Sequence, residues 1–296
     1  MRDNNVAQMD IKIESPFMLI WRRFRRNVPA TIGLGLLLVL LGLSLAAPLV
    51  TDFDPVKQNL AQALQKPSAE HLLGTDYLGR DLFTRLLYGG RLSLTIGFLA
   101  VGFGLALGVP LGAISGYFGG WPDMLIQRFA DILLSFPSFL LALILVALMG
   151  VGVRNIIFSV GILAVPSFIR LVRGSVMVIR SMDYVQASRA LGAPSFGVIL
   201  KHILPNTLTP VIVNASLNLG YAITTAAGLG FLGLGVQPPT PEWGMMLGEA
   251  KTYIFSHSYM VTYPGITIFI AIVGLNLVGD ALRDSLDPRL RDKTFS

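Results

Sequence analysis

The sequence is organised around SMDYVQASRALGAPSFGVILKHILP, the stretch from Ser181 to Pro205. This stretch is polar at its start and lies between long apolar runs. Asp183 and Gln186 have the spacing of a capping box, in which each side chain binds a free backbone donor at a helix start. We therefore expect a helix that begins near Tyr184.

Three further residues divide this stretch into two helices. Gly192 suits the left-handed position that closes a helix, and Pro194 can open the next one. Pro205 is expected to end the second helix, because proline disrupts a helix interior. The pattern predicts a bent pair of helices, here called the elbow (residues 181–205). A bent pair that projects from a membrane bundle fits a groove on another protein; the alternative is an ordinary amphipathic loop helix without a partner.

The composition is that of a membrane protein. Of 296 residues, 53% are hydrophobic and 14% are charged, whereas soluble domains carry about 25% charged residues. The mean hydropathy is +0.66. The formal charge of +6 comes from Lys and Arg beside apolar runs, where they set topology, so we do not expect nucleic acid as a partner. The absence of cysteine excludes disulfides and thiolate metal sites.

Long charge-free runs predict an all-α membrane protein with about six transmembrane helices. Their uninterrupted hydrophobicity excludes the alternating pattern of a β-barrel. The first run is longer than a signal-peptide core, so we interpret it as a retained span, with its preceding Arg cluster also able to anchor at lipid headgroups. The expected spans cover residues 30–50, 92–121, 124–150, 156–172, 208–229 and 261–279, with Asp280 capping the last.

Basic residues orient these spans. Lys and Arg gather on one side, at residues 22–26, 170–201 and 283–293, and this side is predicted to be cytosolic. Both termini and the elbow then lie in the cytosol. The predicted organisation is a cytosolic tail (1–28), a first span (29–50), an extracytoplasmic loop (51–87), a core (88–282) that contains the elbow, and a cytosolic tail (283–296). The glycine-rich stretch from Gly228 to Gly244 is expected in an outer loop.

Small residues and charges mark individual spans. In the second span, glycines recur mostly every four residues from Gly104 to Gly116, which predicts close packing of another helix. In the third span, Pro137 predicts a kink. Arg128 and Asp131 lie three residues apart near its cytosolic end, so they form either a structural ion pair on one helix face or a gate.

Catalytic and metal sites are not expected. His71, Asp76 and Asp81 match the spacing of no metal loop, and we interpret this stretch as a cap and turn before the second span. The phosphate-loop pattern Gly-x-x-x-x-Gly-Lys-Ser/Thr does not occur, since Val198 follows Gly197 where Lys would be required. No hydrolase motif is present either. We therefore expect neither an enzyme nor a cofactor in this chain.

The elbow resembles the cytoplasmic loop motif of ATP-binding-cassette importer permeases. The resemblance rests on Gln186-Ala187-Ser188, Gly192 and Ile203-Leu204-Pro205. The sequence departs from the motif at Gln186 and Ser188, where Glu and Ala are usual, and Ile203 sits one residue off the common register. The stretches at residues 73–81, 229–244 and 276–280 look like those of the second permease subunit of dipeptide, oligopeptide, glutathione and nickel importers.

This resemblance implies a type I importer fold in the bacterial cytoplasmic (inner) membrane. The chain would work with a homologous permease, two ATPase subunits that bind ATP and Mg, an extracytoplasmic solute-binding protein and membrane lipid. Peptides are the first expected solute, with nickel, glutathione or another small solute as the alternative. In the outer loop, Pro239, Glu242 and Trp243 would contact the binding protein; the alternative is a turn-rich loop with an interfacial Trp.

The expected mechanism is alternating access, in which ATP-driven closure of the ATPases moves the elbow. Its docking side is predicted to hold Tyr184, Val185, Ala187 and Leu191. The full set expected to couple to the ATPases is Asp183, Tyr184, Val185, Gln186, Ala187, Ser188, Leu191, Gly192, Pro194 and Pro205. A self-sufficient secondary transporter would show more charges in its spans, and an intramembrane enzyme would need polar catalytic groups at depth.

Overall fold

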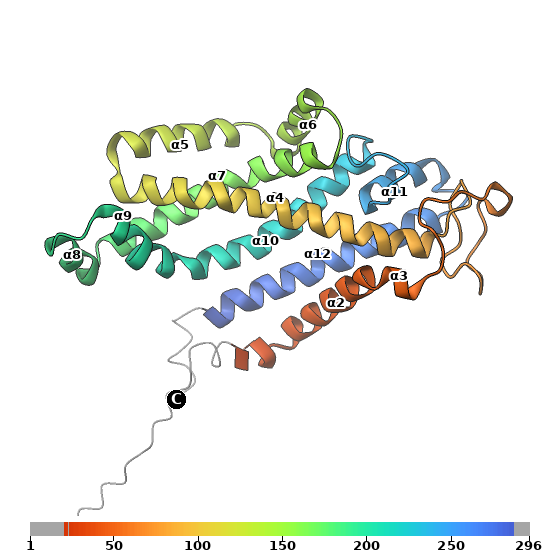
Figure 1. The fold of residues 1–296 in the computed structure, drawn as a ribbon, viewed down its shortest axis with the longest axis horizontal. Coiled ribbons are helices and arrows are strands. Elements are labelled where there is room, and N and C mark those ends of the chain that lie inside the picture. The colour runs from red at the N-terminus through yellow and green to blue at the C-terminus, as the bar shows by residue number, and fades with distance from the viewer. Residues whose placement is uncertain (1–20, 23, 287–296) are drawn as a thin grey trace, which may run out of the picture.

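The computed structural model describes residues 21, 22 and 24–286, and within them the fold is helical without β-strands (Figure 1). The predicted tails (1–28 and 283–296) lie largely outside these residues. The helices are α2 (Val28–Leu45), α3 (Ala47–Val50), α4 (Leu82–Phe118), α5 (Gly120–Leu134), α6 (Ser138–Met149), α7 (Val153–Arg180), α8 (Asp183–Ala190), α9 (Ser195–Val198), α10 (Leu204–Phe231), α11 (Trp243–Ala250) and α12 (Tyr259–Leu286). Short 3-10 turns are η1 (Leu60–Gln62) and η3 (Lys251–Tyr253), and η2 (Ile199–Ile203) is a π-helical turn.

The prediction of about six spans is confirmed. The described chain has 5 helices that are long and apolar enough to cross a membrane, or up to 6 if the bent pair α5 and α6 is one span. This pair is bent by 91°. Pro137 precedes α6 at the bend, so the expected kink is a full break of the helix.

Helices α4 and α7 pack closely along a line of glycines, as the sequence predicts. A Cβ added to Gly108 would lie 2.5 Å from Phe168 Cβ, and one on Gly112 would lie 2.7 Å from the Ile169 carbonyl. Only a residue without a side chain lets the two backbones approach this far. These contacts fix α7, the span that leads into the elbow, against α4.

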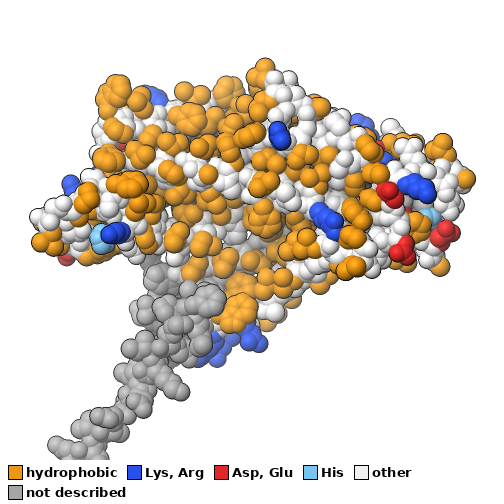
Figure 2. Space-filling view, in the orientation of Figure 1, with side chains coloured by type: hydrophobic (Ala, Val, Ile, Leu, Met, Phe, Trp, Pro, Cys, Tyr) orange, Lys and Arg blue, Asp and Glu red, His pale blue; other side chains and the backbone are white. Residues whose placement is uncertain are grey.

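The elbow and the outer loops lie at opposite ends of the bundle. Figure 1 shows α8 and α9 at one end, and the loop before α4 together with α11 at the other. The start of α2 and the end of α12 meet near the elbow end, where Phe24, Ala30 and Ala281 form a buried cluster. Figure 2 shows apolar side chains over most of the length of this face, while most of its visible acidic side chains gather at the outer-loop end.

Several predicted boundaries are wrong. The outer loop ends at Asp81 rather than at residue 87, because Asp81 caps α4. Gly228 lies inside α10, which continues to Phe231 before the loop begins. Asp280 lies inside α12 and caps nothing, because the chain continues with good helix formers and the helix runs on to Leu286.

Candidate functional site

The first helix of the elbow, α8, begins without the predicted capping box. Its N-cap is Met182, and no side chain caps it. The backbone N–H groups of Val185 and Gln186 donate to the Met182 carbonyl at 3.0 and 3.1 Å. Asp183 therefore sits in the first helical turn, where a carboxylate favours the positive end of the helix dipole.

The bend of the elbow is built on Gly192, as predicted. Its φ is +86°, the left-handed region that favours glycine. The Ala193 N–H donates to the Ser188 carbonyl at 3.1 Å, and the Gly192 N–H donates to the Arg189 carbonyl at 3.0 Å. This pair of bonds is the Schellman motif, which closes α8 and turns the chain. Pro194 is the N-cap of α9, so the second helix begins where the sequence indicates.

Pro205 does not end the second helix, contrary to the prediction. The helix passes from α9 through the π-helical turn Ile199–Ile203 into α10, where Pro205 lies in the first turn. The π-helical turn directly before Pro205 widens the helix locally, and this accommodates a residue that lacks a backbone N–H. The second arm of the elbow and the following span are therefore one continuous helix, Ser195–Phe231.

Buried side chains fasten the elbow to the bundle. Val185, Val198 and Ile203 are each 0% exposed and pack in one cluster with the inner ends of α4 and α7. The Arg180 Nη1 donates to the Tyr117 carbonyl at 2.6 Å, and the Arg189 guanidinium lies 5.8 Å from the centre of the Tyr117 ring. Val185 was predicted on the docking side, but its burial places it on the side that faces the bundle.

Exposed apolar side chains cover the free side of the elbow. Of the residues predicted for docking, Tyr184 and Leu191 are 45% and 88% exposed, and Ala187 is also exposed. Gln186 is exposed as well, and Ser188 is half-buried. Phe196, 71% exposed in the second helix, was missed by the sequence reasoning. An aromatic residue in a segment expected in the cytosol was the signal, since grouped exposed apolar side chains mark contact surfaces.

The predicted ion pair of Arg128 with Asp131 is wrong. Asp131 Oδ1 instead accepts from Arg170 Nη2 at 2.8 Å, which links α5 to α7. The Arg128 side chain is exposed and forms no ion pair within residues 24–286. A second pair joins the same two helices, because Arg173 donates to both carboxylate oxygens of Asp123 at 2.6 and 2.7 Å. Pairing across helices prevails because α7 packs against α5.

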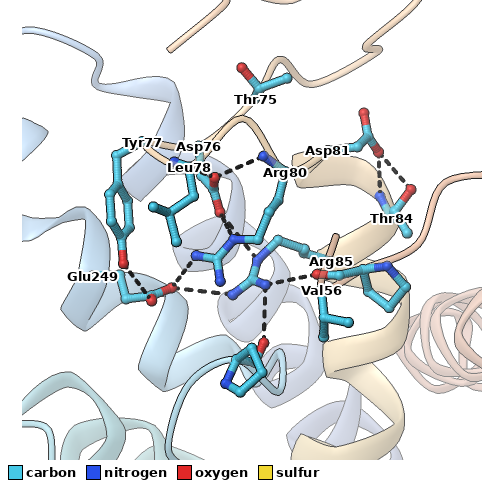
Figure 3. A network of polar contacts seen from close by, with 12 residues as sticks. Val56, Thr75, Asp76, Tyr77, Leu78, Arg80, Asp81, Thr84, Arg85 and Glu249 are labelled. Atoms are coloured by element: carbon cyan, nitrogen blue, oxygen red, sulfur yellow. Dashed lines mark hydrogen bonds and ion pairs between the residues drawn. The ribbon is translucent and has the colours of Figure 1, made fainter. Parts of the chain in front are cut away.

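A buried polar network, here called the outer clamp, ties the loop before α4 to α11 (Figure 3). Glu249 Oε2 accepts from Arg80 Nη2 at 3.0 Å and from Arg85 Nη2 at 3.2 Å. Asp76 Oδ2 accepts from Arg80 Nε at 2.6 Å. The Tyr77 hydroxyl donates to Glu249 Oε1 at 2.9 Å. The pKa of Tyr77 is raised mainly by burial and also by this hydrogen bond. The clamp joins residues 169 positions apart, which no local pattern in the sequence indicates.

The residues considered in the sequence for a metal site, His71, Asp76 and Asp81, stabilise the loop before α4 instead. Asp81 is the N-cap of α4 and accepts from the Thr84 N–H at 2.7 Å, which confirms the predicted cap. His71 Nδ1 lies 2.9 Å from Asp81 Oδ1. In the described part of the chain, no three His, Cys, Asp or Glu side chains gather closely enough to hold a metal.

Two of the three residues predicted to contact a binding protein are buried. Trp243 is 1% exposed, and its Nε1 donates to the Leu86 carbonyl at 3.0 Å. Glu242 is 2% exposed and caps α11, where it accepts from the backbone N–H groups of Gly244 and Met245. The docking prediction is therefore wrong for both side chains. Pro239 is exposed, and its carbonyl accepts from Arg85.

Glu242 links the stability of the outer end to pH. Burial raises the pKa of Glu242, against the opposing effect of its hydrogen bonds, so the folded chain holds this proton more tightly than the unfolded chain. The free energy of unfolding then falls as the pH rises from about 4.3, the unfolded-state pKa, through the raised folded-state pKa. We expect Glu242→Gln to flatten this part of the profile, measured by thermal unfolding in detergent across pH. Glu70→Gln, at an exposed glutamate, should keep the wild-type slope; a Glu242→Gln profile parallel to the wild type would contradict the expectation.

A bundle of long apolar helices with a bent elbow at one end and a clamped loop at the other defines a multi-pass membrane protein. Comparison with known proteins specifies the class further. Residues 108–292 match the family described as binding-protein-dependent transport system inner membrane component, and this chain belongs to that family. Residues 15–67 match the N-terminal transmembrane domain of oligopeptide transport permease C. The chain is therefore a permease component located in the inner membrane.

Curated relatives match nearly the whole chain. The dipeptide transport system permease protein DppC of Alkalihalophilus pseudofirmus is 45% identical over 277 residues, 94% of this chain and 91% of the relative. The di/tripeptide transport system permease protein DppC of Pseudomonas aeruginosa is 44% identical over 94% of each chain. The glutathione transport system permease protein GsiD of Pectobacterium atrosepticum is 40% identical over 95% of this chain and 94% of its own.

A solved structure supports the fold. An inward-facing structure of the MetNI methionine ABC transporter has a chain that aligns with a TM-score of 0.57 at 20% identity. The alignment covers 69% of this chain and 96% of the MetNI chain. The type I importer permease fold expected from the sequence is therefore confirmed. Membership of this class also means that ATPase and solute-binding partners complete the transporter.

Proposed function

We propose that this chain is one of two permease subunits of an ATP-driven importer that carries di- or oligopeptides into the cytosol. The elbow is the observation that carries the proposal. It exposes Tyr184, Leu191 and Phe196 on its free side while Val185 and Ile203 fix it to the spans. The names of the relatives, which specify dipeptides and di/tripeptides, support peptides before glutathione, the cargo named for another relative. Nickel has no support from these names.

The proposed complex contains a homologous permease, two ATPase subunits that bind ATP and Mg, and an extracytoplasmic binding protein. ATP-driven closure of the ATPases would move the elbow, because its free side would lie in a groove on one ATPase. The continuous helix from Ser195 to Phe231 would carry this displacement into the membrane. Such coupling needs two conformations whose balance nucleotide shifts, and alternating access supplies them. ATP hydrolysis itself would occur in the partner subunits.

The test is reconstitution of the complex in vesicles with its loaded binding protein. We expect uptake of a labelled dipeptide that requires ATP, the ATPases and the binding protein together. Uptake by this chain alone would identify a secondary transporter. ATP-dependent uptake of nickel or glutathione, with no uptake of peptides, would replace the proposed cargo while leaving the role of the subunit intact.

A further inference from the structure

A band of polar side chains crosses three helices at mid-membrane depth. It starts with the Asp131–Arg170 ion pair between α5 and α7. Ser167, one turn from Arg170 on α7, accepts from Asn214 Nδ2 of α10 at 3.1 Å. The band continues along one face of α10 through Asn218 and Tyr221. These six residues, Asp131, Ser167, Arg170, Asn214, Asn218 and Tyr221, are here called the polar belt.

Helix lengths place the belt inside the bilayer. Asp131 lies about 16 Å along α5 from Gly120, and Arg170 lies about 15 Å along α7 from Arg180, at 1.5 Å per residue. Both helices begin or end near Tyr117, at the cytosolic end of the bundle. A hydrocarbon core is about 30 Å thick, so both lengths, measured from helix ends near Tyr117, put the ion pair near its middle rather than at the cytosolic ends of the spans, where the sequence predicts these residues.

The belt is also exposed at the surface of this chain. The Arg170 and Asp131 side chains are 54% and 49% exposed, and Tyr221 is 45% exposed. Ser167 is exposed, and Asn214 and Asn218 are half-buried. An exposed ion pair at this depth is costly against lipid, and such charges face the bundle interior or a water-filled cavity.

A water-filled path along the polar belt explains its exposed charges better than a dry interface with the second permease does. Asp131 and Arg170 already satisfy each other, so they need no opposite charge from another chain. Enclosing the pair in a dry interface would add the cost of removing water from two charges. A hydrated path keeps both charges solvated and leaves their remaining hydrogen-bonding capacity free for a solute.

We propose that the polar belt lines the path of the solute, and that Arg170 and Asp131 receive the charged ends of a peptide in transit. Arg170 would meet the terminal carboxylate and Asp131 the terminal ammonium group. This inference rests on the proposed function for the nature of the cargo. A hydrated path past the belt requires only that the chain transports a polar solute.

Cysteine accessibility tests the path, because the chain has no cysteine of its own. In the assembled transporter with cysteine-free partners, Ser167→Cys and Asn218→Cys should react about tenfold faster with a charged, membrane-impermeant thiol reagent than Leu38→Cys. Leu38 is the matched control, because it is 58% exposed in the middle of the peripheral α2. During ATP-driven uptake, a transported dipeptide should slow the labelling of the two belt positions.

The outcomes separate the two proposals. In one outcome, the two belt positions are labelled as slowly as Leu38→Cys in the complex but rapidly in the isolated chain. This result would overturn the proposed solute path and assign the belt to the interface with the second permease. Fast labelling that no transported solute slows would also overturn it. Fast labelling that glutathione or another carried solute slows, while peptides do not, would support the path and refute the peptide cargo.

The role of the ion pair has its own measurement. At saturating binding protein, Arg170→Gln should reduce uptake of a dipeptide with a free carboxylate about tenfold more than uptake of its C-terminal amide, because one charge-assisted hydrogen bond is lost. Asp131→Asn should show the corresponding preference for N-acetylated over free peptides. Equal losses for both members of each substrate pair would mean that the charges only brace α5 against α7.

Discussion

Replacement of Ala187 by arginine is expected to abolish ATP-dependent uptake and the recovery of the ATPases with this chain. Ala187 is exposed on the free side of α8, beside Tyr184. A long charged side chain there would prevent close contact between the elbow and a groove. The measurement is uptake in vesicles together with co-purification of the ATPases, with membrane insertion followed in parallel and expected at the wild-type level.

One variant controls this experiment. Ala187→Ser changes the side chain little and should keep both uptake and complex recovery.

A second pair of variants tests the bend. Gly192→Arg should abolish both uptake and complex recovery. Gly192→Asn should be tolerated better, because asparagine adopts the left-handed conformation more readily. A Cβ at this position would meet no other atom within 4 Å, but the positive φ strains any side chain there, so the asparagine variant measures how much of the loss comes from the backbone. Normal uptake by both bulky variants would refute the assigned role of the elbow.

Replacement of Glu249 by alanine is expected to lower the free energy of unfolding by about 3–5 kcal/mol. Glu249 accepts hydrogen bonds from Arg80, Arg85 and Tyr77. Its removal leaves the guanidinium groups of Arg80 and Arg85, whose side chains are 0% and 1% exposed, with Asp76 as the remaining anion of the clamp. Breaking a buried pair by removing one partner is costly because the other charge stays buried. Chemical or thermal unfolding of the purified chain measures the effect.

An exposed glutamate of the same loop provides the control for the clamp. Glu70 accepts a 3.3 Å bond from Gln62 at the surface, so Glu70→Ala should change the free energy of unfolding by less than about 1 kcal/mol. Glu249→Gln should give an intermediate loss, since it keeps the shape of the side chain but removes its charge. Equal stabilities for Glu249→Ala and Glu70→Ala would show that the clamp does not stabilise the fold.

Local signals in the sequence predicted the elements and the bend of the elbow. Gly192 takes the left-handed conformation, and Pro194 opens α9, because both residues restrict their own backbone. The apolar runs fixed the spans for a similar reason, since length and hydrophobicity are properties of one segment. The order of charges along the chain predicts the cytosolic side of the elbow in the same way.

The largest errors concern packing between segments. Asp131 was assigned to Arg128 on its own helix, but α7 brings Arg170 within 2.8 Å. Glu242 and Trp243 were predicted to be surface residues of a loop. This loop instead folds back against α4, where the Trp243 Nε1 donates a hydrogen bond to the Leu86 carbonyl. Pro205 was expected to break the helix, and a π-helical turn directly before it accommodates the proline instead. The contacts of Asp131 with Arg170 and of Trp243 with Leu86 have no signal within a few residues of either partner.

The uninterrupted helix from Ser195 to Phe231 gives the molecule a lever. Its 37 residues measure about 55 Å from end to end. The far end reaches α11, where a Cβ on Gly230 would lie 2.8 Å from Glu242 Oε2. If this rod pivots at its inner end, a tilt of about 10° swings its tip by roughly 10 Å. A small rotation of the elbow would then become a large displacement on the opposite face of the bilayer.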